Sequence, residues 1–203
     1  MAVRLGIPDS VAGVPLSRRL AWLTGARLLF LFVLLALIGF FFLRRGLGIS
    51  SFTVRAALIV LTVSFGLAGV YAGVLRSGRR ITELADAQLV LDQLTWTAVV
   101  YLSGGAASGA TSFYGLSCLV GAILTGMRGA AIAAVTAGAC FGLLLIGLQT
   151  GRLSPPPDQP ASLYSLSADE VVYYAVVNLL VLVVVTLLAG ISFVGSTPLR
   201  ISR

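Results

Sequence analysis

Asp92 lies eight residues into a stretch of sequence that is apolar enough to cross a membrane although it also contains Asp86. Asp92 stands between Gln88 and Gln93 within residues 84–102, a segment rich in leucine, valine and threonine. A carboxylate inside a membrane costs about 2.5–3.5 kcal/mol on insertion scales unless it is buried, paired or protonated. The sequence leaves two interpretations open. In the functional one, Asp92 carries a proton, couples a signal or makes a polar contact to a partner helix, together with Gln88 and Gln93. In the structural one, it forms an interhelical hydrogen bond that only fixes packing.

A second polar cluster is the uncharged stretch SGGAASG, which directly follows residue 102. Its polar and small residues are Ser103, Gly104, Gly105, Ser108 and Gly109. Glycine permits positive φ angles and close contact between helices. A phosphate-binding loop would need a following Gly-Lys-Ser/Thr, and a nucleophilic serine would need a base, but the chain has no histidine and no lysine. The stretch therefore predicts a tight turn and no catalytic chemistry.

The composition indicates an integral membrane protein. Of the 203 residues, 58% are hydrophobic and 10% are charged, whereas soluble domains carry about 25% charged residues. The lack of histidine excludes histidine triads, histidine-ligated zinc and phosphohistidine within the chain, and we expect no metal and no cofactor. The net charge of +7 comes from arginines that punctuate apolar runs. Because they form no basic face, they indicate a lipid bilayer as partner and no nucleic acid.

Six segments are long and apolar enough to be transmembrane helices, which predicts an all-α, polytopic membrane protein. They are residues 26–43, 56–75, 84–102, 110–127, 129–148 and 171–194. The break between the fourth segment and the fifth consists of residues 127–129 only, so these two should pack antiparallel. Three consecutive prolines within residues 151–170 exclude a helical interior there and predict an extramembrane loop.

The arginine distribution predicts the orientation of the chain. With six spans, nine arginines lie in segments on the side of the termini and four on the opposite side, so the positive-inside rule predicts that both termini are cytoplasmic. The domains are then residues 1–25, a cytoplasmic segment with an interfacial helix, residues 26–194, the six-helix membrane domain, and residues 195–203, a short cytoplasmic tail. Arg27 is interpreted as an anchor whose side chain reaches toward the membrane interface.

Pairs of glycines with GxxxG spacing recur along the chain. They are residues 69 and 73, 138 and 142, and 147 and 151. This spacing lets helix backbones touch, so it favours helices packed on one another or on a second copy of the chain.

The run LADAQLVLDQLTWTAVVYLSGGAASG, residues 84–109, resembles part of a known family. It is similar to the third span and the following turn in the six-helix membrane input region of pilus-type (PilS-like) sensor histidine kinases. Asp92 matches the aspartate of that span, and Ser103, Gly104, Gly105, Ser108 and Gly109 match its turn. The segment RRLAWLTGARLLF, residues 18–30, also resembles the beginning of that region. The resemblance covers roughly residues 17–194, and only the stretch around the turn is specific.

The resemblance implies a membrane sensory (input) domain of a two-component signal-transduction histidine kinase in the bacterial inner membrane. It implies a homodimer whose last helix is coupled to cytoplasmic kinase regions, and a membrane-embedded partner such as a pilin-like helix or a lipid. The chain itself contains no phosphoacceptor histidine and no ATP-binding region. We therefore expect no enzymatic activity from it, as a fragment of a longer kinase or as a truncated paralogue.

Two other classes of function stay open from the sequence. A small membrane transporter or channel component is supported by Asp92, with Gln88, Gln93 and Thr95 nearby, because these side chains could line a polar path. The lack of repeated halves and of broken helices speaks against it. A structural membrane subunit that stabilises a partner by packing is the third class.

Overall fold

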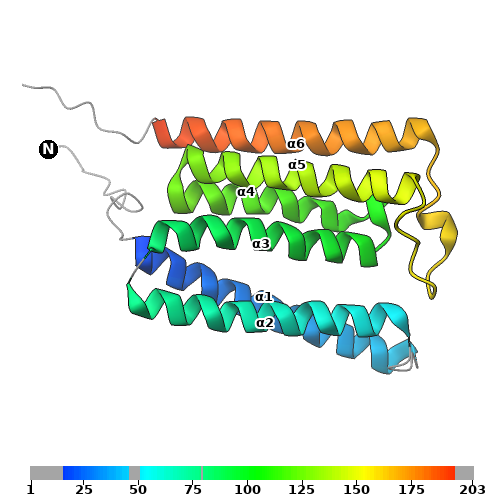
Figure 1. Ribbon diagram of the computed structural model, residues 1–203, viewed down its shortest axis with the longest axis horizontal. Helices are drawn as coiled ribbons and strands as arrows, with labels where there is room; N and C mark the ends of the chain where they lie inside the picture. Colours follow the sequence, from blue (N-terminus) through cyan, green and yellow to red (C-terminus); the bar gives the residue numbers. More distant parts are fainter. Residues whose placement is uncertain (1–15, 46–50, 79, 195–203) are drawn as a thin grey trace, which may run out of the picture.

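Six α-helices run side by side in an elongated bundle (Figure 1). The computed structural model describes residues 16–45, 51–78 and 80–194, and within these ranges the chain is helical and has no β-strand. The helices are α1 (Leu16–Arg45), α2 (Phe52–Ser77), α3 (Ile81–Leu102), α4 (Ser112–Thr125), α5 (Met127–Gln149) and α6 (Ala168–Val194). The predicted all-α class is confirmed. The predicted cytoplasmic tail, residues 195–203, and residues 1–15 lie outside the described residues.

Four of the six helices are long and apolar enough to cross a membrane on their own, namely α1, α2, α5 and α6. Helix α3 is less apolar because it carries Glu83, Asp86 and Asp92. Helix α4 has 14 residues, which is about 21 Å of helix against a hydrocarbon core of about 30 Å. Both of these helices nevertheless run alongside the other four (Figure 1). A multi-pass helical architecture is therefore supported, with four candidate spans where the sequence predicts six.

Helix α1 is longer than the predicted first span. The sequence separates an interfacial helix from residues 26–43, whereas the structure joins both into one helix of 30 residues. The side chain of Leu20 is fully buried, and Arg19 Nη1 donates a hydrogen bond of 3.1 Å to the carbonyl oxygen of Ile123. The beginning of α1 therefore packs against the bundle itself.

Helices α4 and α5 form a tight antiparallel hairpin, as the short break between them predicts (Figure 1). A single glycine, Gly126 with φ of 69°, separates the two helices. The backbones touch at Gly121 and Gly129, where a Cβ on either residue would overlap the backbone of the other. Glycine is thus required at both positions for this close approach.

The GxxxG pairs do not make this kind of contact within the chain. A Cβ at Gly69, Gly73, Gly138 or Gly142 would meet no atom within 4 Å. The third pair serves the end of α5, where Gly151 has φ of 67° in the turn. The prediction that these spacings mark helix contacts inside the chain is therefore wrong. Their contact with a second copy stays a prediction.

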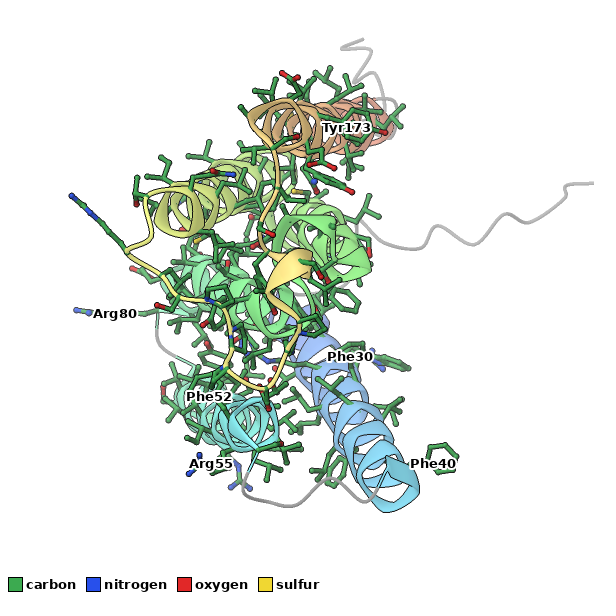
Figure 2. The ribbon with its side chains drawn as sticks, turned by 90° about the vertical axis from the view of Figure 1, so that its right-hand side faces the viewer. Phe30, Phe40, Phe52, Arg55, Arg80 and Tyr173 are labelled. Carbon is green, nitrogen blue, oxygen red and sulfur yellow. The ribbon has the colours of Figure 1, made fainter. Side chains whose placement is uncertain are left out.

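The bundle has two parts, a pair formed by α1 and α2 and a group formed by α3 to α6. Figure 2 shows the pair on one side of the molecule, with Phe40 and Phe52, and α6 with Tyr173 on the other. The most deeply buried apolar side chains come mainly from α3, α4 and α5, for example Leu89, Tyr114 and Phe141. The core also reaches the helix pair through Leu20 of α1, and further contacts between the pair and the group of four decide how the two parts sit.

Candidate functional site

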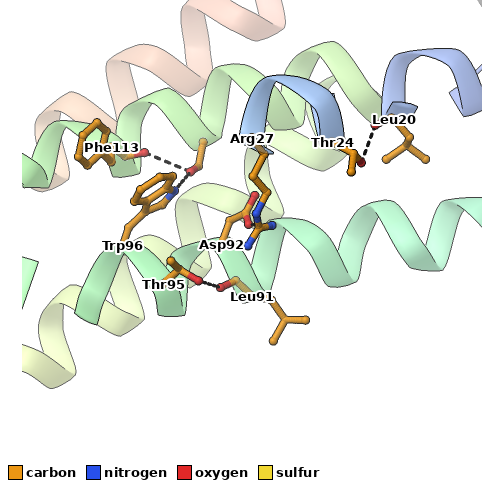
Figure 3. A network of polar contacts seen from close by, with 9 residues as sticks. Leu20, Thr24, Arg27, Leu91, Asp92, Thr95, Trp96 and Phe113 are labelled. Carbon is orange, nitrogen blue, oxygen red and sulfur yellow. Dashed lines mark hydrogen bonds and ion pairs between the residues drawn. The ribbon is translucent and has the colours of Figure 1, made fainter. Parts of the chain in front are cut away.

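An ion pair joins the two parts of the bundle near the middle of their helices. Arg27 of α1 and Asp92 of α3 form this pair, with 12% and 21% of their side chains exposed (Figure 3). Each residue lies eleven positions after the start of its helix, or about 16 Å at 1.5 Å per residue. The Arg27 guanidinium also stands 5.4 Å from the ring centroid of Tyr71 on α2, a distance at which a cation is attracted to the ring face. We call Arg27 and Asp92 the central ion pair.

The prediction that Arg27 anchors the helix at the membrane interface is wrong, because its side chain turns inward and meets Asp92. The sequence contained a signal for this contact. Two opposite charges inside predicted spans would each be costly alone, and burial favours their pairing. The signal was missed because nothing in the sequence says which helices are neighbours.

An aromatic cluster lies beside the central ion pair. The ring centroids of Phe30, Trp96 and Phe113 are 4.7–5.4 Å apart. Trp96 Nε1 donates a hydrogen bond of 2.9 Å to Ser117 Oγ, which in turn donates one of 3.1 Å to the Phe113 carbonyl oxygen (Figure 3). The cluster connects α1, α3 and α4, and its one polar ring atom, Trp96 Nε1, has a hydrogen-bond partner.

A cavity of about 250 Å³ lies between α1, α3 and α4, against the central ion pair. We call it the central cavity. Most of its wall is apolar or aromatic, and its polar residues lie on α1, α3 and α4. The wall is formed by Leu23, Thr24, Ala26, Arg27, Phe30, Gln88, Leu89, Asp92, Trp96, Leu116, Ser117, Val120 and Leu124. The site is therefore an apolar chamber with one charge pair in its wall.

The structure brings Gln88 to this site and separates Gln93 from it. Gln88 lines the cavity together with Asp92. Gln93 is fully buried and donates a hydrogen bond of 3.3 Å from Nε2 to the Ala133 carbonyl oxygen on α5. The predicted polar cluster of Asp92 with both glutamines is therefore correct for Gln88 and wrong for Gln93. Asp92 and Gln93 are neighbours in the sequence, so their side chains point about 100° apart around the helix.

The serine and glycine stretch after α3 is a turn, as predicted. It consists of two short 3-10 helices, η1 (Gly105–Ala107) and η2 (Gly109–Thr111). Gly104 and Gly105 have φ angles of 119° and 67°. The hydroxyls of Ser103 and Ser108 are 2.6 Å apart, and Ser108 Oγ accepts from the backbone N–H of Ala110. Both serines are engaged in holding the turn.

A second polar network closes the end of the bundle where this turn lies. Asp158, in the loop between α5 and α6, accepts hydrogen bonds of 2.7 and 2.6 Å from the backbone N–H and the hydroxyl of Thr53. Thr53 lies in the first turn of α2, where a carboxylate also meets the positive end of the helix dipole. Burial alone would raise the pKa of Asp158, but the hydrogen bonds from Thr53 hold it below its usual 3.8.

Two further loop residues extend this network to α3. Gln159 Nε2 donates to the carbonyl oxygen of Leu102 at 2.5 Å and to Thr53 Oγ1 at 3.1 Å. The Tyr164 hydroxyl lies 2.8 Å from both the Tyr101 carbonyl oxygen and Gln159 Oε1, and burial raises the pKa of Tyr164. We call Thr53, Asp158, Gln159 and Tyr164 the loop cap. It ties α2 to α3 as the central ion pair ties α1 to α3.

The part of the chain that the structure describes holds no group of three or more histidine, cysteine or acidic residues placed to bind a metal ion. Comparisons with protein-family models, with curated proteins and with solved structures each find no match to this chain.

Proposed function

We propose that this chain is the membrane sensory (input) domain of a two-component signal-transduction histidine kinase. The observation that carries the proposal is the central ion pair, which joins α1 to α3 halfway along the helices and borders the central cavity. Asp92, its acidic member, is the residue that matches the aspartate of pilus-type sensor kinases. An ion pair between two packed parts of a protein can act as a switch, because the distance between its charges depends on how the two parts are positioned.

The proposed signal is a small movement of the α1–α2 pair against the group of four helices. A buried ion pair is stable only while both partners meet, since an unpaired charge in an apolar setting is strongly unfavourable. A stimulus that binds one arrangement better than the other shifts the population between them. Helix α6 packs against α4 and α5 and would carry the shift toward the cytoplasm as a small displacement.

The proposal includes six spans, with both termini in the cytoplasm of a bacterium and the domain in its inner membrane. Helices α3 and α4 run beside the four apolar helices (Figure 1), so a bilayer that encloses those four also encloses them. Arg76, Arg80 and Arg128 lie at the ends of α2, α3 and α5 on the side of the termini, and the positive-inside rule makes this side the proposed cytoplasmic one. A homodimer through the open glycine faces of α2 and α5 belongs to the same proposal.

The test is a phosphorylation assay on the native product. Antibody against residues 151–170 precipitates the protein with its partners from detergent-solubilised cells, and labelled ATP is added. We expect acid-labile phosphate, which is characteristic of phosphohistidine, on the precipitated chain or on a copurified kinase. Replacing Asp92→Asn on the chromosome should change the phosphate level at least threefold.

Asp86→Asn is the matched control for this assay. Asp86 lies on the same helix and pairs with Arg128 at 2.6 Å, but that arginine is 64% exposed. The control should leave the phosphate level unchanged. If no acid-labile phosphate is found, or if both variants behave alike, the sensor proposal is wrong.

Transport is the second candidate, because the central cavity reaches a charge pair inside the bundle. The apolar character of most of the cavity wall favours sensing over the passage of polar solutes. Flux of labelled ions and small solutes into proteoliposomes separates the two. Flux that Asp92→Asn abolishes would support transport and count against the sensor proposal.

A further inference from the structure

Gln88 contributes a carboxamide to the wall of the central cavity. Its side chain is 7% exposed and lines the cavity. The other polar groups there are engaged: Thr24 donates to the Leu20 carbonyl oxygen, Ser117 bonds Trp96, and Arg27 pairs with Asp92. The Gln88 carboxamide offers two N–H donors and an acceptor oxygen to the polar head group of a molecule in the cavity.

The size and the walls of the cavity define the rest of that ligand. An apolar protein cavity of about 150 Å³ holds a benzene molecule, so about 250 Å³ accommodates a ring with a few further carbon atoms. Phe30, Trp96 and Leu116 supply aromatic and aliphatic walls. Leu116 is also 51% exposed on the outer surface of the bundle, so the cavity is reachable from the side that a bilayer would cover.

The central ion pair determines the charge of the ligand. Arg27 and Asp92 neutralise each other, so an anionic or cationic ligand would introduce a buried charge without a partner, which is strongly unfavourable. A neutral head group brings no such charge. The ligand is therefore expected to be uncharged.

We infer that the central cavity binds one neutral, membrane-soluble amphiphile of ring size, whose hydroxyl or carbonyl head is hydrogen-bonded to Gln88. Such a ligand contacts α1, α3 and α4 at once and stands next to the central ion pair. The inference rests on the proposed function for its role, since it names the class of stimulus, but binding itself is measured without any kinase output.

The test uses Trp96 as a reporter inside the cavity wall. The variant Trp22→Phe leaves Trp96 as the single tryptophan, and the full chain is placed in lipid nanodiscs. Three bromine-labelled probes of equal size are titrated at pH 7: a butylphenol, a butylbenzene and a butylbenzoate. Bromine quenches tryptophan fluorescence on contact, and empty nanodiscs correct for partition into the lipid.

We expect saturable quenching by the butylphenol and at least tenfold weaker binding of the other two probes. Gln88→Leu should weaken the butylphenol about tenfold, as the loss of one buried hydrogen bond predicts, and leave the butylbenzene unchanged. Gln149→Leu is the matched control, because Gln149 is exposed at the end of α5, and it should change nothing. Equal binding of the butylphenol and the butylbenzene, or no effect of Gln88→Leu, would overturn the inference.

The outcome of this experiment distinguishes the binding inference from the proposed function. Acid-labile phosphate without saturable quenching overturns the ligand and leaves the sensor proposal intact. Saturable, Gln88-dependent quenching without any phosphate supports the binding site and removes the kinase assignment.

Discussion

The central ion pair and the loop cap both tie the α1–α2 pair to the rest of the bundle, but they do so by different chemistry. The central ion pair consists of two charges that meet inside apolar surroundings. The loop cap consists of several hydrogen bonds among one carboxylate, two hydroxyls, a carboxamide and backbone groups at the end of the bundle. In the first, each charge has one oppositely charged partner, whereas the second shares its bonds among three segments, α2, the end of α3 and the loop between α5 and α6.

This difference in chemistry suggests different roles: the central ion pair can change between two arrangements, and the loop cap keeps its helices in place. A network of shared hydrogen bonds at an exposed end loses little when one bond breaks, because water replaces the lost partner. A charge pair in an apolar site has no such replacement. We therefore expect the loop cap to keep α2 and α3 together while the central ion pair responds to what enters the cavity.

Removing one charge of the central ion pair should have the largest effect on stability. Arg27→Leu leaves Asp92 without its partner, and we expect a loss of about 3 kcal/mol, the lower end for breaking a buried pair, because Asp92 keeps some exposure. The measurement is the midpoint of thermal unfolding of the purified chain in detergent.

The double variant Arg27→Leu, Asp92→Leu is the control for that prediction. Replacing both charges by apolar groups removes the unpaired carboxylate, so most of the lost stability should return. A double variant that is less stable than Arg27→Leu alone would mean that the pair stabilises through packing, and the contrast with the loop cap would disappear.

Cutting the loop cap should cost less. Asp158→Ala removes the acceptor for both hydrogen bonds from Thr53, and loss of a capping side chain costs about 0.5–2 kcal/mol. Thermal unfolding in the same detergent measures this loss. A loss of stability larger than that of Arg27→Leu would mean that the loop cap stabilises the bundle more than the central ion pair does.

Acid should weaken the loop cap through Asp158. The pKa of its carboxyl in the folded chain lies below the ordinary value of 3.8, so the cap contributes its full stability above pH about 4 and loses it as the pH falls through that lowered pKa. The difference in unfolding midpoint between the wild type and Asp158→Asn should shrink below pH 4. A difference that stays constant down to pH 2 would show that the charge of Asp158 does not contribute.

The smallest effect is expected for the second ion pair of α3. Asp86→Asn removes a contact to Arg128, whose side chain is 64% exposed, and exposed pairs contribute about 0–1 kcal/mol. The unfolding midpoint in low salt measures it. A loss as large as that of Arg27→Leu would mean that depth in the bundle is irrelevant.

The sequence predicts the helices well and their neighbours poorly. Periodic apolar runs and charged ends place the helices within a few residues of α2 to α6, since a single helix needs only local information. The partner of Asp92 lies 65 positions earlier in the chain, and the partner of Asp158 lies 105 positions earlier. Such contacts depend on how the helices assemble, so the sequence identifies Asp92 as unusual but identifies neither its partner nor the contact of Asp158.

The glycines show the same limit. The GxxxG spacing predicts close helix contacts on α2 and α5. The close backbone contact instead joins Gly121 of α4 to Gly129 of α5, on either side of a turn. The spacing rule describes one helix against another of unknown identity. The contact follows instead from the sharp turn at Gly126, which folds two neighbouring helices together.

The same hairpin has a consequence for how the protein is made. Only one residue, Gly126, lies between α4 and α5, so their contact needs no distant segment and closes only a short loop. During synthesis, these two helices can pair as soon as α5 has left the ribosome and before α6 has emerged from it. A bulky residue at Gly129 would therefore act at the insertion step and lower the amount of protein that reaches the membrane.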